Sequence, residues 1–237
     1  VFFRSEYGAG NLKYNLFKDD STASDTFDCF DLATAQNYSW SYMGDINNTI
    51  IRDQLNSDTM GKMGQLASRN RYCHVYLNGQ YWGMYFFQER PEASFAASYL
   101  GGSGDDYDVL HADGGGAGAI YNMVVTDGNS NAYRRLWAYA VNTGFVSVAN
   151  YSYIQGLNPD GSKNTNYEDL VEVDSVADFM INIFYTGDND EAVSWYRAGH
   201  IPANLAEVNN YYTSRDRTGR HGGFRFILHD SEHTYDV

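Results

Sequence analysis

Two β-rich runs joined by an Asn-Gly pair constrain the fold of this 237-residue chain more than any other local feature. The runs are Arg71–Leu77 and Gln80–Gln88, and Asn78-Gly79 between them is the preferred pair for a two-residue hairpin turn. Both turn positions need positive φ, which Asn and Gly adopt at low cost. The pattern therefore predicts an antiparallel β-hairpin in the first half of the chain.

Short strands and one helix are expected before the hairpin. Leu12–Phe17 and Phe27–Leu32 read as extended segments. A helix should follow, because Asn47 or Asn48 can cap its start and Gly61 can end it. Its apolar stripe is expected to consist of Ile50, Ile51 and Leu55.

Helices are expected to dominate after the hairpin. Pro91 suits the first turn of a helix through Leu100, which Gly101-Gly102 ends. Further helices are predicted over Asn131–Asn142 and Ser175–Tyr185. We therefore divide the chain into a strand-rich part, residues 1–90, and a mainly helical part, residues 91–237.

A short strand and a glycine-rich loop interrupt the helical part. Tyr107–His111 reads as the strand. The glycines between Gly114 and Gly118 lack the spacing and the trailing Lys-Ser or Lys-Thr of a P-loop. We interpret them as a loop or lid.

The last strand of the chain leads into two carboxylates. Phe224, Phe226 and Leu228 line one side of it, and strict alternation would place Asp230 and Glu232 on the same side. Neighbouring carboxylates beside an apolar face repel one another unless a cation, a proton or hydrogen-bond donors compensate them. A divalent metal satisfies that need, and a strand that leaves the core for a solvated acidic turn explains the pattern equally well.

Charge and hydropathy exclude several classes of partner. Thirty Asp and Glu against sixteen Lys and Arg give a net charge of −14, which repels nucleic acid and anionic lipid. No apolar stretch is long enough to span a bilayer, so no membrane insertion is expected within this segment. Cys29 and Cys73 could form one disulfide or remain two thiols. The strand-like start at Val1 suggests a fragment of a longer chain.

Four motifs, in this order and spacing, resemble the CotH kinase family, named after spore-coat protein H. They are Tyr76–Tyr85 with Gln88–Arg90, then Asp105–Leu110, then Gly187–Asp190, and finally Phe226–Glu232. The resemblance implies an α+β, atypical protein kinase-like fold, with a strand-rich N-terminal lobe and a helical C-terminal lobe. It also implies phosphate transfer from ATP, with Mg²⁺ or Mn²⁺, to Ser or Thr hydroxyls of a protein substrate.

The resemblance also assigns roles to particular carboxylates. Asp190 matches the catalytic aspartate, which would orient or deprotonate the attacking hydroxyl. Asp230 matches the aspartate that opens the metal-binding motif of the family. Glu232 stands where many members have a second aspartate, and glutamate can still ligate magnesium through one oxygen.

A cationic group for the phosphates is less clearly marked. Arg52 is our first candidate and Lys13 the second, and Glu89 would brace one of them as the lysine–glutamate pair does in ordinary kinases. The alternative is that these cations are only solvated and that Glu89 pairs with Arg69 or Arg90.

One departure from kinase-like sites concerns the second metal ligand. An Asn is expected four or five residues after the catalytic Asp, and Ser194 and Trp195 stand there. Asn189, Asn209 or Asn210 can take its place. Among the histidines, His111 could face the nucleotide or belong to the core or surface, and His229 and His233 are expected to be packed or hydrogen-bonded.

Two other functions therefore stay open. The chain could be a non-catalytic kinase-like binding module of a larger surface or secreted protein. It could also be a carboxylate- or metal-dependent glycan hydrolase that uses its tryptophans as sugar platforms, namely Trp40, Trp82, Trp137 and Trp195.

Overall fold

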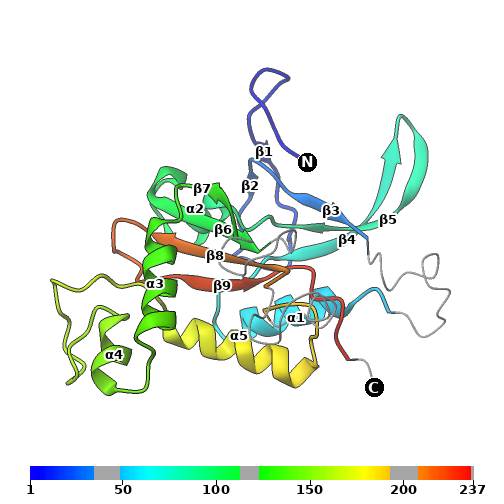
Figure 1. The fold of residues 1–237 in the computed structure, drawn as a ribbon. Helices are drawn as coiled ribbons and strands as arrows, with labels where there is room; N and C mark the ends of the chain where they lie inside the picture. The colour runs from blue at the N-terminus through cyan, green and yellow to red at the C-terminus, as the bar shows by residue number, and fades with distance from the viewer. Residues whose placement is uncertain (35–48, 113–122, 193–207, 236–237) are drawn as a thin grey trace.

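The fold is α+β, as the sequence predicts. The computed structural model describes residues 1–34, 49–112, 123–192 and 208–235, and within these ranges it contains three antiparallel sheets and five α-helices (Figure 1). Several predicted features lie outside the described residues, namely the Asn47/Asn48 cap, the glycines at 114–118, Trp40, Ser194 and Trp195. The division at residue 90 and the two-lobed arrangement stay predictions.

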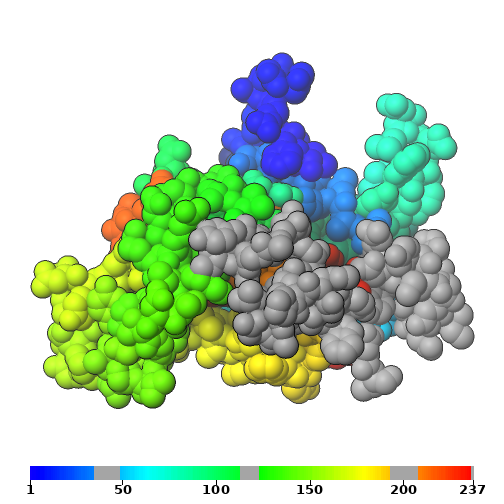
Figure 2. Space-filling view, viewed as in Figure 1, coloured from blue at the N-terminus to red at the C-terminus, as the bar shows by residue number. Residues whose placement is uncertain are grey.

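The predicted hairpin is confirmed. Strands β4 (Asn70–Leu77) and β5 (Gln80–Gln88) pair antiparallel, and the turn between them has φ of 50° at Asn78 and 81° at Gly79. The short strand β3 (Asp31–Ala33) joins the other edge of β5 and gives the order β3-β5-β4. The tip of the hairpin projects from the body of the molecule (Figures 1 and 2).

The first thirty residues contain less regular strand than expected. Only β1 (Leu12–Lys13) and β2 (Thr26–Phe27) form a ladder there, and they make a separate two-stranded sheet. Aromatic side chains hold this region to the hairpin sheet, since Phe87 of β5 lies in one buried cluster with Phe17, Phe27 and Phe30. Packing between rings therefore substitutes for long backbone ladders.

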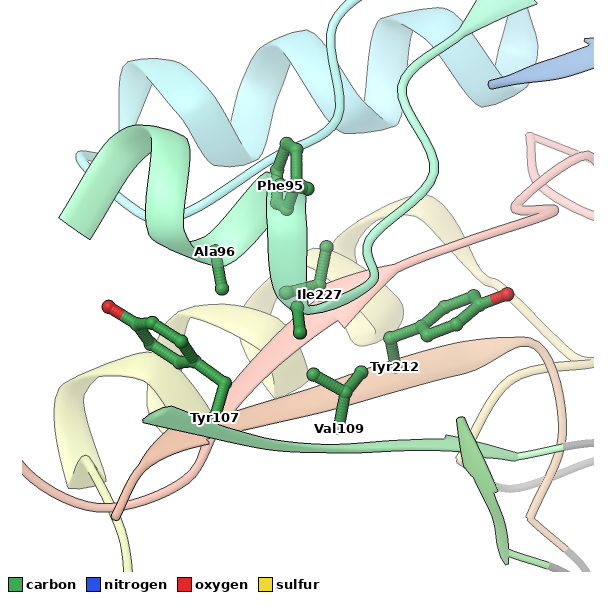
Figure 3. Close-up of a cluster of buried hydrophobic side chains, with 7 residues drawn as sticks. Phe95, Ala96, Tyr107, Val109, Tyr212 and Ile227 are labelled. Atoms are coloured by element: carbon green, nitrogen blue, oxygen red, sulfur yellow. The ribbon is translucent and has the colours of Figure 1, made fainter. Parts of the chain in front are cut away.

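The largest sheet lies in the second part of the chain, which is consequently not as helical as predicted. Its strands are β6 (Tyr107–Ala112), β7 (Met123–Asp127), β8 (Tyr211–Asp216) and β9 (Arg225–Leu228), in the order β7-β6-β8-β9. Helix α2 (Ala93–Leu100) packs on one face, and Figure 3 shows its Phe95 and Ala96 meeting Tyr107, Val109, Tyr212 and Ile227.

Two helices cover the opposite face of that sheet. Helix α5 (Val173–Thr186) supplies Phe179 and Ile183, and helix α1 (Arg52–Lys62) supplies Met60, to a cluster that contains Leu228 of β9. Two further helices, α3 (Asn131–Asn142) and α4 (Val148–Tyr153), lie at the other end of α5 (Figure 1). Both ends of α3 agree with the prediction. None of the helices in the described ranges combines the length and the apolar character needed to cross a bilayer.

The predicted apolar stripe of α1 is wrong. Ile51 and Leu55 are exposed, whereas Asp53, Asn56, Ser57 and Met60 are buried. The buried face is mostly polar because it hydrogen-bonds the segment after β9: Asn56 donates to the carbonyl of Ser231 at 2.9 Å. Helix α1 thus uses polar contacts where an amphipathic helix would use apolar ones.

The alternation predicted beyond β9 is also wrong. The strand ends at Leu228, and Asp230 has a φ of 59°, in the left-handed region. A left-handed residue turns the chain, so the two-residue period of side-chain direction cannot continue to Glu232. As a result Asp230 is exposed while Glu232 is buried.

Candidate functional site

The acidic loop after α5 is shaped by Gly187. This residue caps the helix in the left-handed conformation, with φ of 67°, as glycine commonly does. The amide of Asp188 then bonds the carbonyl of Ile183 at 3.0 Å, and the amide of Asp190 donates to Oδ1 of Asp188 at 3.2 Å. The loop is therefore tied both to the end of the helix and to itself.

Ser231 joins this loop and helix α1 to the segment after β9. Its backbone amide donates to Oδ1 of Asp53 at 3.0 Å, and its hydroxyl donates to Oε1 of Glu191 at 2.7 Å. All three residues are buried. Segments that are far apart in sequence consequently meet at one place, and each of them brings carboxylates.

Asp190 lies in this meeting place with part of its side chain accessible. Its side chain is 14% exposed, and its Oδ2 accepts a hydrogen bond from the side-chain nitrogen Nδ2 of Asn210 at 3.1 Å. Nε2 of His233 lies 3.9 Å from the same oxygen. Asn210, one of the residues considered in place of the missing Asn, therefore contacts the predicted catalytic carboxylate.

We call the six acidic side chains gathered here the carboxylate cluster, namely Asp53, Asp188, Asp190, Glu191, Asp230 and Glu232. Desolvation of the carboxyl by the protein around it, followed by the charges of Glu232 and other members of the cluster, raises the pKa of Asp230 to about 8, even though the residue as a whole keeps an exposed surface. Burial raises the pKa of Asp188 to about 7, and that of fully buried Glu191 well above its ordinary value. Burial and the mutual repulsion of the carboxylates therefore favour the protonated forms of these three side chains.

Several oxygens of this region have no hydrogen-bond partner. Oδ2 of Asp188, Oδ1 of Asn189 and Oε2 of Glu191 are all buried and unpartnered. Hard divalent cations such as Mg²⁺ prefer carboxylate and carbonyl oxygens, so this donor set fits magnesium chemically. Among the described residues, however, no three His, Cys, Asp or Glu side chains are already arranged around one point as metal ligands.

A cluster of rings precedes Asp230. His111 of β6 stacks on Tyr212 of β8 with centroids 4.2 Å apart, and His229 meets Tyr212 edge-on at 5.1 Å. Burial, with a contribution from His111, lowers the pKa of His229 to about 4, so the ring is neutral at pH 7. The Tyr212 hydroxyl and Nδ1 of His229 are buried without partners. Polar atoms of the rings beside the cluster thus also lack partners.

Glu89 is paired inside the protein. The residue is 3% exposed, accepts hydrogen bonds from the amide of Arg69 at 3.0 Å and from the Tyr99 hydroxyl, and lies 3.8 Å from Nη1 of Arg69. This is the Arg69 pairing that the sequence left open.

The two predicted phosphate-binding cations lie in different places. Arg52 is the first residue of α1 and is adjacent to Asp53 of the carboxylate cluster. Lys13 is exposed on β1, and in Figure 1 this strand is well separated from the segment after β9. The structure therefore places Arg52 at the end of α1 that contains Asp53, and Lys13 in a separate two-stranded sheet.

Asp53 and Glu191 were not identified as site residues from the sequence. A signal for Asp53 does exist, because Asp53, Asn56, Ser57 and Met60 follow the spacing of a buried helix face although three of them are polar. Polar residues at core spacing indicate a face that hydrogen-bonds its partner. Glu191 has no comparable signal, since it follows a turn.

Comparison with known proteins adds one finding. A model of the family described as CotH kinase protein matches residues 37–237. The match includes all six members of the carboxylate cluster and excludes Lys13. A search of curated proteins returned no match.

Proposed function

The chain belongs to the CotH kinase protein family, and we propose that it transfers a phosphoryl group from ATP to serine or threonine hydroxyls of a protein substrate. The observation that carries the proposal is the carboxylate cluster, where buried oxygens of Asp188 and Glu191 have no partner. Phosphoryl transfer needs metal-held phosphates, a positioned nucleophile and cationic groups more than covalent help from the protein. A concentration of uncompensated carboxylates suits the first two needs.

In this proposal the carboxylate of Asp190 binds the acceptor hydroxyl of the substrate. Its side chain is partly accessible, so a substrate serine or threonine can approach it, and Asn210 fixes one of its oxygens at 3.1 Å. The carboxylate would orient the hydroxyl and accept its proton as the bond to phosphorus forms. Nε2 of His233 lies 3.9 Å from Oδ2 of Asp190 and would help to hold the carboxylate in that orientation.

Asp230 and Glu232 are the proposed ligands of Mg²⁺ or Mn²⁺, with Asp188 as a third. The left-handed turn at Asp230 directs these carboxylates from the end of β9 toward the loop after α5. The raised pKa values of Asp230 and Asp188 mean that these carboxyls hold protons near neutral pH, which a bound cation would displace. A bound cation would neutralise the phosphate charges of ATP during transfer. Glu232 is buried, which suits a ligand that is withdrawn from solvent.

Arg52 is the proposed contact for the nucleotide phosphates. It begins an eleven-residue helix, whose free amides and dipole favour anions at that end. Glu89 does not contact the nucleotide in this scheme. Its hydrogen bond and ion pair with Arg69 hold the connection between α1 and β4 in place. Lys13 has no part in the proposal, since β1 lies away from the cluster (Figure 1).

A nucleotide thermal-shift series combined with a transfer assay tests the proposal. The wild-type protein should gain thermal stability with ATP and magnesium together and much less with ATP and a chelator, and it should label a serine- or threonine-rich acceptor. Stabilisation without transfer to any acceptor, to water or to itself would identify a nucleotide-binding module. No response to any nucleotide would remove the kinase proposal, and glycan hydrolysis would be the next activity to assay.

A further inference from the structure

An apolar cavity lies between α3, α4, the start of α5 and β9, at the end of α5 that is far from the acidic loop (Figure 1). Its volume is about 310 Å³, and every side chain that lines it is apolar or aromatic. Tyr133, Leu136, Trp137 and Ala140 of α3 contribute one helix face to its wall, at positions i, i+3, i+4 and i+7. An unpaired polar or charged group would be costly to bury there, so the group that covers the cavity is apolar.

The chain that forms most of this cavity carries no charge. Residues 136–159 include no Asp, Glu, Lys or Arg, and no other stretch of the sequence without these residues is as long. This stretch contains the second half of α3, the connection to α4 and all of α4. Because the whole chain has a net charge of −14, an acidic protein meets less repulsion here than at a surface that exposes carboxylates.

Apolar side chains are also exposed around the cavity. Val141, Phe145, Val148 and Tyr151 are exposed, and Val146 is fully exposed. Phe145 and Tyr151 line the cavity as well, so these five residues and the cavity form one surface, which we call the α3–α4 surface. Exposed apolar patches mark interaction sites, and protein interfaces are enriched in aromatic residues and depleted in charged ones. A small ligand inside the cavity would leave Val146 and its neighbours exposed, so a protein partner fits the surface better.

The backbone holds the exposed side chains in a defined place. The amide of Gly144, whose φ is 71°, donates to the carbonyl of Tyr139 at 3.1 Å and ends α3. The hydroxyl oxygen of Ser147 accepts from the amide of Asn150 at 3.1 Å and begins α4. Val146 lies between these two caps. A projecting apolar side chain on an anchored connection therefore lies beside an apolar cavity.

We propose that the α3–α4 surface joins two copies of this chain in a symmetric dimer, in which the α3–α4 connection of each copy packs over the cavity of the other. In a two-fold interface the same patch serves both copies, so it must contain a projection and a place that receives it. The α3–α4 surface contains both. Its lack of charge also allows two chains of net charge −14 to meet without facing carboxylates.

The size of the surface indicates a weak dimer. Eleven residues line the cavity, and Val141, Val146 and Val148 add three more. Stable interfaces of standard size use roughly 20–30 residues on each side. The dimer is therefore expected to dissociate on dilution. It is separate from the proposed kinase site, so it can form whether or not the chain transfers phosphate.

Sedimentation velocity of the whole chain, from micromolar to near-millimolar concentration, tests the proposal. Monomer should convert to dimer as the concentration rises. Added sodium chloride should strengthen the dimer, because salt screens the repulsion between two chains of net charge −14 while apolar contacts remain. An interface built on ion pairs would instead weaken with salt.

Two variants test the projection and the cavity separately. Val146→Asp should weaken dimerisation by roughly tenfold or more, because the new carboxylate would be buried without a partner at the interface. Ala140→Leu fills part of the cavity and should weaken dimerisation severalfold, because the side chains of the other copy lose the space that they enter. Val146 is fully exposed and Ala140 lines the cavity, so thermal melts of the dilute variants should match the wild type.

Leu77→Asp is the matched control. It makes the same charge change at an exposed apolar residue of the β4–β5 hairpin, which also projects from the molecule, and it should dimerise like the wild type. A wild-type chain that stays monomeric at every concentration would overturn the proposal, and the surface would then belong to a different partner. A dimer that weakens with salt, that survives Val146→Asp or Ala140→Leu unchanged, or that is lost in Leu77→Asp would overturn it as well.

Discussion

The hydroxyl of Ser231 donates a hydrogen bond to Oε1 of Glu191 at 2.7 Å, and this buried bond joins the segment after β9 to the loop after α5. The same serine uses its amide to hold Asp53 of α1 at 3.0 Å. One small residue, through its backbone amide and its hydroxyl, therefore holds α1, the loop that contains Asp190 and the segment that contains Asp230 together. The carboxylate cluster depends on a residue that contributes no charge to it.

Ser231→Ala should consequently destabilise the protein. The substitution leaves the Glu191 carboxyl, already unpartnered at Oε2, without its remaining hydrogen bond. A buried polar group left in this way costs about 1–3 kcal/mol. Urea denaturation at neutral pH gives the free energy of unfolding. Ser214→Ala is the matched control, because its buried hydroxyl has no partner to lose, and its stability should be unchanged or slightly increased. Equal losses in the two variants would contradict the role given to Ser231.

A second prediction concerns the hairpin turn. Gly79 has φ of 81°, and an added Cβ would meet no atom within 4 Å, so backbone strain is the only penalty for a larger residue there. Gly79→Val should therefore lower the free energy of unfolding by about 1–3 kcal/mol. Gly79→Asn should cost much less, since Asn tolerates the left-handed region. Thermal melts of both variants check this. An unchanged melting temperature for Gly79→Val would show that position 79 accommodates a β-branched residue without backbone strain.

Local signals predicted the elements, and distant contacts determined the site. The hairpin at Asn78-Gly79 and helix α3 follow from short-range chemistry, so sequence alone located both. The strand alternation failed at Asp230, because a single left-handed residue redirects the chain and nothing in its neighbours requires that conformation. Family resemblance pointed to Asp190 and Asp230 as a pair.

The buried face of α1 shows the opposite failure. Ile51 and Leu55 look like the core face of an isolated helix, yet they are exposed, because the helix packs its polar side against Ser231. That choice depends on a segment nearly two hundred residues away, so no local window contains it. The only local indication of this packing was the helical core spacing of the polar residues Asp53, Asn56 and Ser57.

A third prediction is a pH dependence that comes from Glu89. Burial raises its pKa to about 7 from 4.5. Between these values the folded protein retains a proton that the unfolded chain has released, so stability falls as the pH rises through the window, and the loss is complete above pH 7. The shift corresponds to a loss on the order of 3 kcal/mol.

Glu89→Gln removes this titration while it preserves the shape and the acceptor oxygen for Tyr99. It also removes the second acceptor, to which the amide of Arg69 donates at 3.0 Å, and this loss lowers stability by an amount that does not vary with pH. The free energy of unfolding of the variant, relative to wild type, should rise by on the order of 3 kcal/mol from pH 4.5 to pH 7 and then level off. Chemical denaturation across that range measures the difference. A difference that is flat with pH would mean that Glu89 is ionised in the folded protein at its ordinary pKa.

The last prediction separates the two carboxylates that the proposed kinase needs most. Asp190→Asn should lower the rate of phosphate transfer by about 10²–10⁴-fold. Magnesium-ATP should still bind, because the carboxylate acts on the acceptor hydroxyl and not on the nucleotide. Asp230→Asn should lose both transfer and magnesium-dependent ATP binding, since Asp230 is a proposed metal ligand. Asn is the suitable replacement at Asp230 because its φ of 59° would strain most other side chains.

Calorimetric titration with magnesium-ATP and labelled-phosphate transfer, carried out on the same preparations, measure the contrast. Asn at position 190 can still accept a hydrogen bond from Asn210, so the loop after α5 should keep its shape and the loss should lie in the chemistry. If both variants lose nucleotide binding equally, Asp190 belongs to the metal site. If Asp230→Asn binds magnesium-ATP as well as the wild type does, the metal lies elsewhere and the carboxylate cluster needs another explanation, because its raised pKa values then have no cation to relieve them.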